Sequence, residues 1–176
     1  MQKNLRLLLW KDCKRKCEYC CNSTLTVLPF PHKDMFAYKD IIISGGEPFL
    51  YPKKFIMAAG RIYTSTDFES KIYVYTAGDD KFNDWLREGD HLDMFMSYID
   101  GITYTLHKQS DFKEFTRFDQ ITCKRRPLGF SRRLYLMPSV DISKETIYAD
   151  WEIKNITPQK DCPIPDNEEC YLWEER

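Results

Sequence analysis

Along the chain, segments whose hydrophobic residues are spaced as in β-strands alternate with segments whose hydrophobic residues are spaced as in α-helices. The order of these segments predicts the class of fold. Short apolar runs rich in β-branched and aromatic residues are typical of strands, and they occur at 5–10, 40–46, 71–78, 100–107 and 132–140. Apolar residues at helical spacing follow three of these runs, at 53–63, 79–89 and 110–118. Strands that alternate with helices indicate an α/β protein with a parallel sheet.

The length of the chain limits how far such a sheet can close. A complete eightfold barrel typically takes about 250 residues, whereas this chain has 176. We therefore expect one domain over 1–176, built as a partial (β/α)5–6 barrel whose core spans about 1–140. Residues 141–176 contain a possible strand or helix around "IYADWEI" and then a tail that is rich in Pro and acidic residues. We expect this tail to pack on the barrel through Trp151 and Trp173.

Composition and charge exclude several classes of protein. Hydrophobic residues make up 43% and charged residues 30% of the chain, which is typical of globular domains and not of disordered ones. Because the net charge is only −1, neither nucleic acid nor a membrane is an expected partner. The apolar run "LLLW" is too short for a signal peptide or a membrane span. We expect a cytoplasmic protein, in which clustered cysteines indicate metal ligands or catalytic thiols before disulfides.

Four of the seven cysteines lie in one short stretch, "CKRKCEYCC", in the loop after the first predicted strand. Cys13, Cys17 and Cys20 are spaced CxxxCxxC, and three thiolates can bind three irons of a [4Fe–4S] cluster while the fourth iron takes another ligand. A structural zinc site normally has four ligands, usually as two separated CxxC pairs, and the sequence has no second such pair. Two alternatives stay open: Cys21 can replace Cys20 by a register shift, or the three positions share one helix face as core residues.

A second motif, "SGGEP", ends the next predicted strand with Gly45, Gly46 and Glu47. Glycines have no Cβ atom, so the backbone of a strand end can approach a ligand closely there. CxxxCxxC followed by GGEP closely resembles the radical S-adenosylmethionine (SAM) superfamily. The resemblance covers the predicted barrel and is sharp at 13–20 and 44–48. The chain looks most like the short radical SAM proteins of phages and gut bacteria.

The resemblance implies a set of cofactors and a reaction. Cys13, Cys17 and Cys20 would hold a [4Fe–4S] cluster. Tyr19 would lie near the adenine of SAM, and the glycine pair would bring backbone carbonyls to its ammonium group. SAM would bind the open iron, and an electron from the reduced cluster would cleave it to a 5′-deoxyadenosyl radical that removes hydrogen from a substrate. A flavodoxin or ferredoxin would supply that electron.

Side-chain alternation along the fourth predicted strand adds candidate cofactor-binding residues. In "ITYTLH" the polar residues Thr103, Thr105 and His107 share one side, and apolar residues share the other. We expect the apolar side to meet helices and the polar side to face the barrel interior. Candidate contacts of SAM or substrate on this strand are therefore Thr105 and His107. Thr76 ends the third predicted strand in a similar position, and the resemblance adds Glu47 of the GGEP motif. Thr is also a common strand residue, and His107 can instead cap the next helix. No catalytic residue is assigned from the sequence.

Two basic stretches have less specific interpretations. The segment 123–133 connects a helix to a strand, so we expect a solvated loop on the face opposite the active site. Lys14, Arg15 and Lys16 lie beside the cysteines, where they receive an acidic electron donor, tune the cluster potential, or are ordinary surface charge. The other cysteines lack a tight motif and support a second cluster only weakly; they are Cys123, Cys162 and Cys170.

These observations predict a minimal radical SAM enzyme whose substrate is a small molecule, a nucleotide or a peptide. One alternative is an activating subunit that installs a glycyl radical on a partner enzyme, although the N-terminal glycine-rich segment of those subunits is missing here. An alternative of another class is a non-enzymatic iron–sulfur redox or regulatory module. Such a module would need no GGEP motif and would usually take all cluster ligands from the protein.

Overall fold

The computed structural model describes residues 2–17, 20, 25–31, 35–125, 127–157 and 164–174. Its strands are β1 (Asn4–Leu8), β2 (Leu28–Pro29), β3 (Asp40–Ser44), β4 (Lys71–Thr76), β5 (Gly101–Leu106), β6 (Ser131–Leu136), β7 (Glu152–Asn155) and β8 (Glu168–Leu172). They form one sheet with the order β2-β8-β1-β3-β4-β5-β6-β7. Every neighbouring pair in it is parallel. Strands β2 and β7 are the edges, so the sheet is open and not closed into a barrel.

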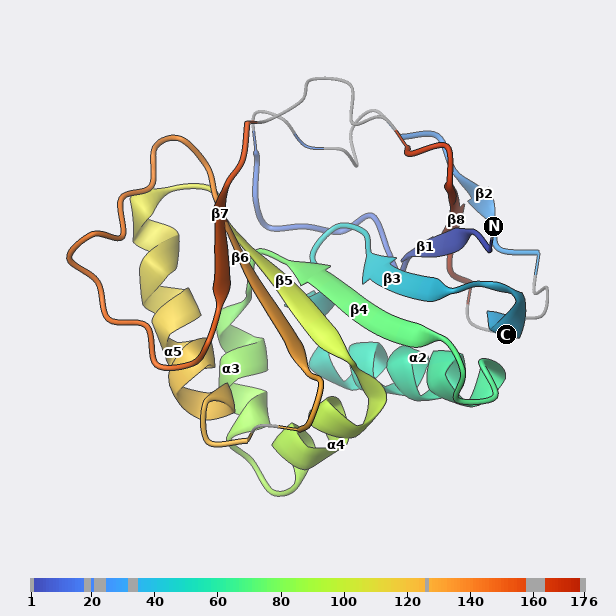
Figure 1. The fold of residues 1–176 in the computed structure, drawn as a ribbon, viewed down its shortest axis with the longest axis horizontal. Helices are drawn as coiled ribbons and strands as arrows, with labels where there is room; N and C mark the ends of the chain where they lie inside the picture. Colours follow the sequence, from blue (N-terminus) through green and yellow to red (C-terminus); the bar gives the residue numbers. More distant parts are fainter. Residues whose placement is uncertain are drawn as a thin grey trace.

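The helices cover one face of this sheet. They are the 3-10 helices η1 (Met35–Ala37), η2 (Pro48–Leu50) and η3 (Gln109–Asp111), and the α-helices α2 (Pro52–Ser65), α3 (Asp80–Leu86), α4 (His91–Tyr98) and α5 (Phe112–Thr122). Figure 1 shows the α-helices on the same side of the sheet. The strand residues that point toward them include Leu7, Ile43 and Val74, all fully buried. Burial of such aliphatic side chains is the main force that holds helices to a sheet.

The described fold contains the five strands and three helices that the sequence predicts, and β7 overlaps the possible strand around "IYADWEI". It adds α4, the three 3-10 helices and the strands β2 and β8. The predicted strands are β1, β3, β4, β5 and β6, and the predicted helices are α2, α3 and α5. The prediction extended the helix of 79–89 to Gly89, but α3 ends at Leu86 and α4 begins two residues after that glycine. The open parallel sheet is compatible with a partial α/β barrel. In the described part of the chain, none of the helices combines the length and apolar character needed to cross a membrane.

The C-terminal part adds strands near both edges of the sheet. Strand β7 pairs with β6, and β8 inserts between β1 and β2. Trp151 and Trp173 are both buried, as the sequence suggests. The carboxylate of Asp119, which is fully buried in α5, accepts hydrogen bonds from Trp151 Nε1 at 2.9 Å and from the backbone N–H groups of Tyr148 and Ala149 at 2.6 and 3.1 Å. Asp119 therefore ties the approach to β7 onto α5.

An aromatic cluster positions the segment that follows the glycine pair. The ring of Phe49, in η2, stacks on Phe82 of α3 with centroids 3.7 Å apart. It also meets Phe55 of α2 edge-on at 5.1 Å. All three rings are buried. Because Phe49 follows Glu47 by two residues, its packing holds the GGEP turn against the helical layer.

Candidate functional site

The loops that carry the two predicted motifs meet beyond the carboxyl ends of neighbouring strands. Strand β1 leads into the cysteine loop, and β3 leads into the glycine pair. The N–H of Gly46 donates to the carbonyl of Trp10 at 2.7 Å, and the N–H of Glu47 donates to the carbonyl of Asp12 at 2.9 Å. The loops therefore continue the pairing of β1 with β3 beyond the strands.

This close approach requires both glycines. Gly45 has a φ of +129°, and a Cβ atom there would lie 2.6 Å from the carbonyl oxygen of Trp10. A Cβ atom on Gly46 would lie 1.8 Å from the carbonyl oxygen of Asp12. Because both opposing atoms belong to the backbone, no change of side-chain rotamer relieves the clash. The glycines thus let one loop pack on the other, and their contact with SAM stays a prediction.

The three predicted cluster ligands are half-buried and influence one another electrostatically. The N–H of Arg15 donates to Cys13 Sγ at 3.3 Å. Burial is the main cause that raises the pKa of Cys13, and it likewise raises the pKa of Cys17. A negative charge on Cys20 raises both pKa values further. Within the described ranges, no group of three His, Cys, Asp or Glu side chains is arranged to hold a metal ion.

The donor set itself fits an iron–sulfur cluster. Three partly exposed thiols in one loop are the ligand type that such clusters take, and three of them leave one iron for another ligand. The predicted adenine contact Tyr19 and the alternative ligand Cys21 both lie outside the described residues, as does Cys162. Cys123 lies at the end of α5 and Cys170 lies in β8.

Glu47 is almost fully buried and is held by three hydrogen bonds. Its carboxylate accepts from the hydroxyl of Thr76 and from the N–H groups of Ala77 and Phe49, the latter two at 2.9 and 3.0 Å. Burial raises the pKa of Glu47, and these hydrogen bonds oppose that rise. Thr76 also accepts from the N–H of Gly78 at 2.8 Å. The predicted cofactor contact Thr76 therefore joins the GGEP turn to the end of β4.

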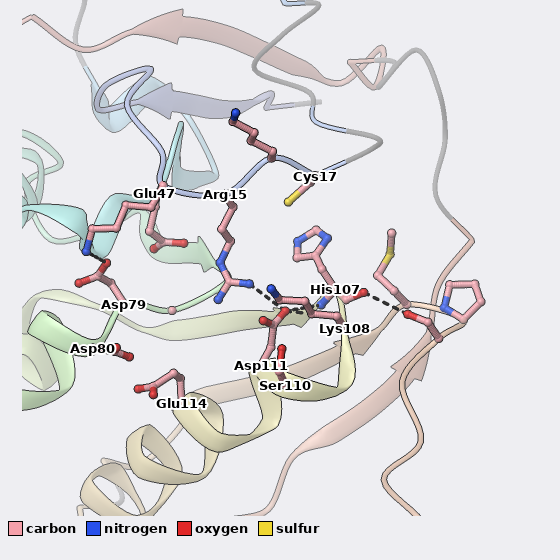
Figure 2. Close-up of a pocket in the computed structure, with 16 residues that line it drawn as sticks. Arg15, Cys17, Glu47, Asp79, Asp80, His107, Lys108, Ser110, Asp111 and Glu114 are labelled. Carbon is pink, nitrogen blue, oxygen red and sulfur yellow. Dashed lines mark hydrogen bonds and ion pairs between the residues drawn. The ribbon is translucent and has the colours of Figure 1, made fainter.

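A pocket of about 890 Å³ lies beside the cysteine loop, over the ends of β4, β5 and β6. Figure 2 shows Arg15 and Cys17 on one wall. Acidic side chains from the starts of α3 and α5 form the opposite wall; they are Asp79, Asp80, Asp111 and Glu114. Burial raises the pKa of Glu114, and a hydrogen bond with Asp80 raises it further. The pocket thus presents charges of both signs.

His107 and Thr105 differ in their relation to this pocket. His107 lines it, and burial and the charge of Arg15 lower the pKa of its imidazole. Thr105 is not among the described residues that line it. The alternation predicted for β5 is present, because Tyr104 lies on the helix side and its ring meets Phe115 of α5 at 5.2 Å. Thr105 therefore lies on the sheet face that points away from the helices.

Two ion pairs connect the cysteine loop to the acidic wall. Arg15 Nη1 lies 2.8 Å from Asp111 Oδ2, and Lys14 Nζ lies 2.6 Å from Asp79 Oδ2. The two carboxylates of these ion pairs were not identified as site residues from the sequence. Their positions in the sequence could have indicated them, since Asp79 closely follows β4 and Asp111 closely follows β5. Residues just after parallel strands gather at the reactive edge of such sheets.

The described residues of the basic segment 123–133 lie away from the pocket, as predicted. It connects the end of α5 to the amino end of β6, which is the opposite edge of the sheet. Arg132 uses its Nη2 atom to donate to the carbonyls of Thr122 and Arg125, at 3.1 and 2.9 Å. Arg125 forms an ion pair with Asp93 of α4 at 2.9 Å. These contacts hold the segment against α4 and α5.

No family model matches the chain, and no curated protein matches it. The function must therefore be inferred from the motifs and from the geometry of the site.

Proposed function

We propose that the protein is a radical SAM enzyme with a partial α/β barrel. Cys13, Cys17 and Cys20 hold a [4Fe–4S] cluster, and SAM binds in the adjoining pocket. The observation that carries this proposal is the backbone pairing of the two motif loops, through the N–H groups of Gly46 and Glu47. It supports a shared role because the residues just before CxxxCxxC bond to GGEP at the edge of the sheet where ligands of parallel α/β proteins bind.

The residues of the chain bind and orient the ligands. When bound, the cluster and SAM supply one-electron reduction and hydrogen abstraction. Glu47 fixes the glycine turn to β4 through its bonds with Thr76 and Ala77. Cys17 lines the pocket, and Cys13 and Cys20 of the same loop are half-buried like it. A rigid frame of this kind lowers the cost of ordering a ligand.

The pocket has a suitable size and charge for a zwitterionic ligand such as SAM. Its volume of about 890 Å³ lies within the range of roughly 300–1,000 Å³ that is typical of small-molecule sites. Lys108 can bind a carboxylate and Asp80 can bind an ammonium group, whereas Glu114 already forms an ion pair with Arg117 at 3.4 Å. Lys14 and Asp79 neutralise each other, because they already form an ion pair. The substrate is left unassigned.

The proposal is tested by SAM cleavage under anaerobic conditions. The protein is purified without oxygen, reconstituted with iron and sulfide, reduced and given SAM, and 5′-deoxyadenosine is measured. We expect slow formation of 5′-deoxyadenosine even without substrate. A cluster that forms but never cleaves SAM would instead support the non-enzymatic iron–sulfur module. Copurification with a large enzyme that carries a glycyl-radical loop would favour the activating subunit.

The ligand assignment makes a prediction for Cys17→Ala. This variant is expected to lose the cluster and SAM cleavage together, since only two of the three thiolates stay in place. Iron content, visible absorbance and 5′-deoxyadenosine report the two losses separately. Cys123→Ala is the matched control, because Cys123 is also half-buried but lies at the end of α5. Normal iron content or normal cleavage in Cys17→Ala would show that the ligands are assigned wrongly.

A further inference from the structure

We infer that Arg15 is a positioning residue that fastens the cysteine loop to the ends of β4 and β5 and keeps a positive charge beside the cluster thiols. The first half of this inference concerns the protein without cofactors. The second half, on the cluster, rests on the proposed function. The two halves are therefore tested separately.

Arg15 connects three segments that are far apart in the chain. It lies between Cys13 and Cys17, and its backbone N–H donates to Cys13 Sγ at 3.3 Å. Its guanidinium donates to the carbonyl of Ala77, just after β4, at 2.7 Å. The same group forms an ion pair with Asp111, in the turn after β5, at 2.8 Å. Figure 2 shows the side chain extending from the cysteine loop toward Asp111.

The acceptors of Arg15 are themselves fixed. The Asp111 side chain is only 4% exposed, and its Oδ2 also accepts from the backbone N–H groups of His107 and Lys108 at 2.9 and 3.2 Å. The N–H of Ala77 donates to Glu47, so its carbonyl is also held in place. A planar guanidinium can satisfy both acceptors at once, whereas an ammonium group is a single point charge. The two fixed acceptors thus determine how the Arg15 side chain is oriented, and through it where the cysteine loop lies.

The neighbouring basic residues do not share this environment. The side chain of Arg15 is 21% exposed, whereas that of Lys14 is 54% exposed and that of Lys16 lies in an exposed position. Solvent and salt screen a partly buried ion pair much less than an exposed one. Arg15 is therefore the member of this basic run whose ion pair is screened least by solvent.

Arg15 lies two residues from both Cys13 and Cys17, and it lines the same pocket as Cys17. A cation favours the more negative of two states at a nearby group. A reduced cluster carries one negative charge more than an oxidised one. Arg15 should therefore favour reduction of a cluster held by these thiols.

The first test uses the metal-free protein and amide hydrogen exchange. Arg15→Gln is expected to speed exchange by about tenfold at Arg15, Gly46 and Glu47, whose N–H groups donate within or onto this loop, because the loop loses its fastening to two strand ends. Lys16→Gln is the matched control, since it removes the same charge from an exposed position of the same loop, and it should change exchange less than about twofold. Arg15→Lys should give an intermediate rate. Wild-type exchange in Arg15→Gln would overturn the fastening role.

The second test uses the reconstituted protein and a redox titration. Arg15→Gln is expected to shift the one-electron equilibrium about tenfold toward the oxidised cluster, which is a fall of about 59 mV in reduction potential. Arg15→Lys retains the charge and should stay near the wild-type potential. A shift in Lys16→Gln as large as that in Arg15→Gln would overturn the electrostatic role. If the wild-type protein takes up no cluster, the proposed function fails, and hydrogen exchange still decides whether Arg15 fastens the loop.

Discussion

At the scale of single residues, Thr76 is a predicted ligand contact whose hydroxyl bonds to a buried side chain of the protein. Its place at a strand end predicts a contact with SAM or substrate. In the structure its hydroxyl donates to the carboxylate of Glu47. A buried carboxylate without donors is costly, so the neighbouring strand supplies them. The role of Thr76 in the described structure is to orient a residue of the GGEP motif.

This role predicts the effect of Thr76→Val on stability. The substitution keeps the shape of the side chain but removes the hydroxyl that donates to Glu47. We expect a loss of about 1.5–3 kcal/mol in the free energy of unfolding, because the lost bond has a charged acceptor. Thr76→Ser keeps the hydroxyl and should cost about 1 kcal/mol or less. Urea unfolding measures both, and a Val variant as stable as the Ser variant would contradict the role of this bond.

At the scale of elements, the site depends on two strand-to-loop transitions that touch through their backbones. The GGEP sequence predicts a close approach, and the ligand was the expected neighbour. In the structure the neighbour is the cysteine loop, through the carbonyls of Trp10 and Asp12. A local motif can show that a Cβ atom is not tolerated, but it does not show which atoms fill that space.

Gly46→Ala is therefore expected to separate the loop from the strand end. Its Cβ atom would lie 1.8 Å from the carbonyl oxygen of Asp12, so the backbone must shift. We expect a loss of at least about 2 kcal/mol in the free energy of unfolding. Gly60→Ala in α2 is the control, since its Cβ atom would lie 3.3 Å from a ring atom of Tyr98 and alanine favours helix. Equal stabilities of the two variants would count against the close approach.

At the scale of the whole molecule, the sheet is completed by a strand from the far end of the chain. Strand β8 pairs with β1 along its full length, and the N–H of Trp173 donates to the carbonyl of Leu8 at 2.8 Å. Strand β1 is thereby an interior strand of the sheet. The strand that leads into the cysteine loop is thus supported on both sides.

A chain that ends at residue 157 tests this arrangement, because it keeps β7 and lacks β8. Its β1 would become an unpaired edge next to the site, and exposed parallel edges promote aggregation. We expect loss of cooperative unfolding and association, measured by circular dichroism and size-exclusion chromatography. A chain that ends at Glu174 keeps β8 and should behave like the full chain. A monomeric, cooperatively folded protein ending at residue 157 would show that β8 is dispensable.

The local sequence determined the five central strands, three helices and the order of the two motifs, because periodicity and motif spacing involve residues that are close in the chain. Its pattern did not predict β8, whose five residues are all only partly buried and show no alternation. Tertiary structure alone decided that Arg15 meets Asp111 and that Thr76 meets Glu47. These pairs join distant segments, and such partners are chosen by strand order and burial, which local periodicity does not encode.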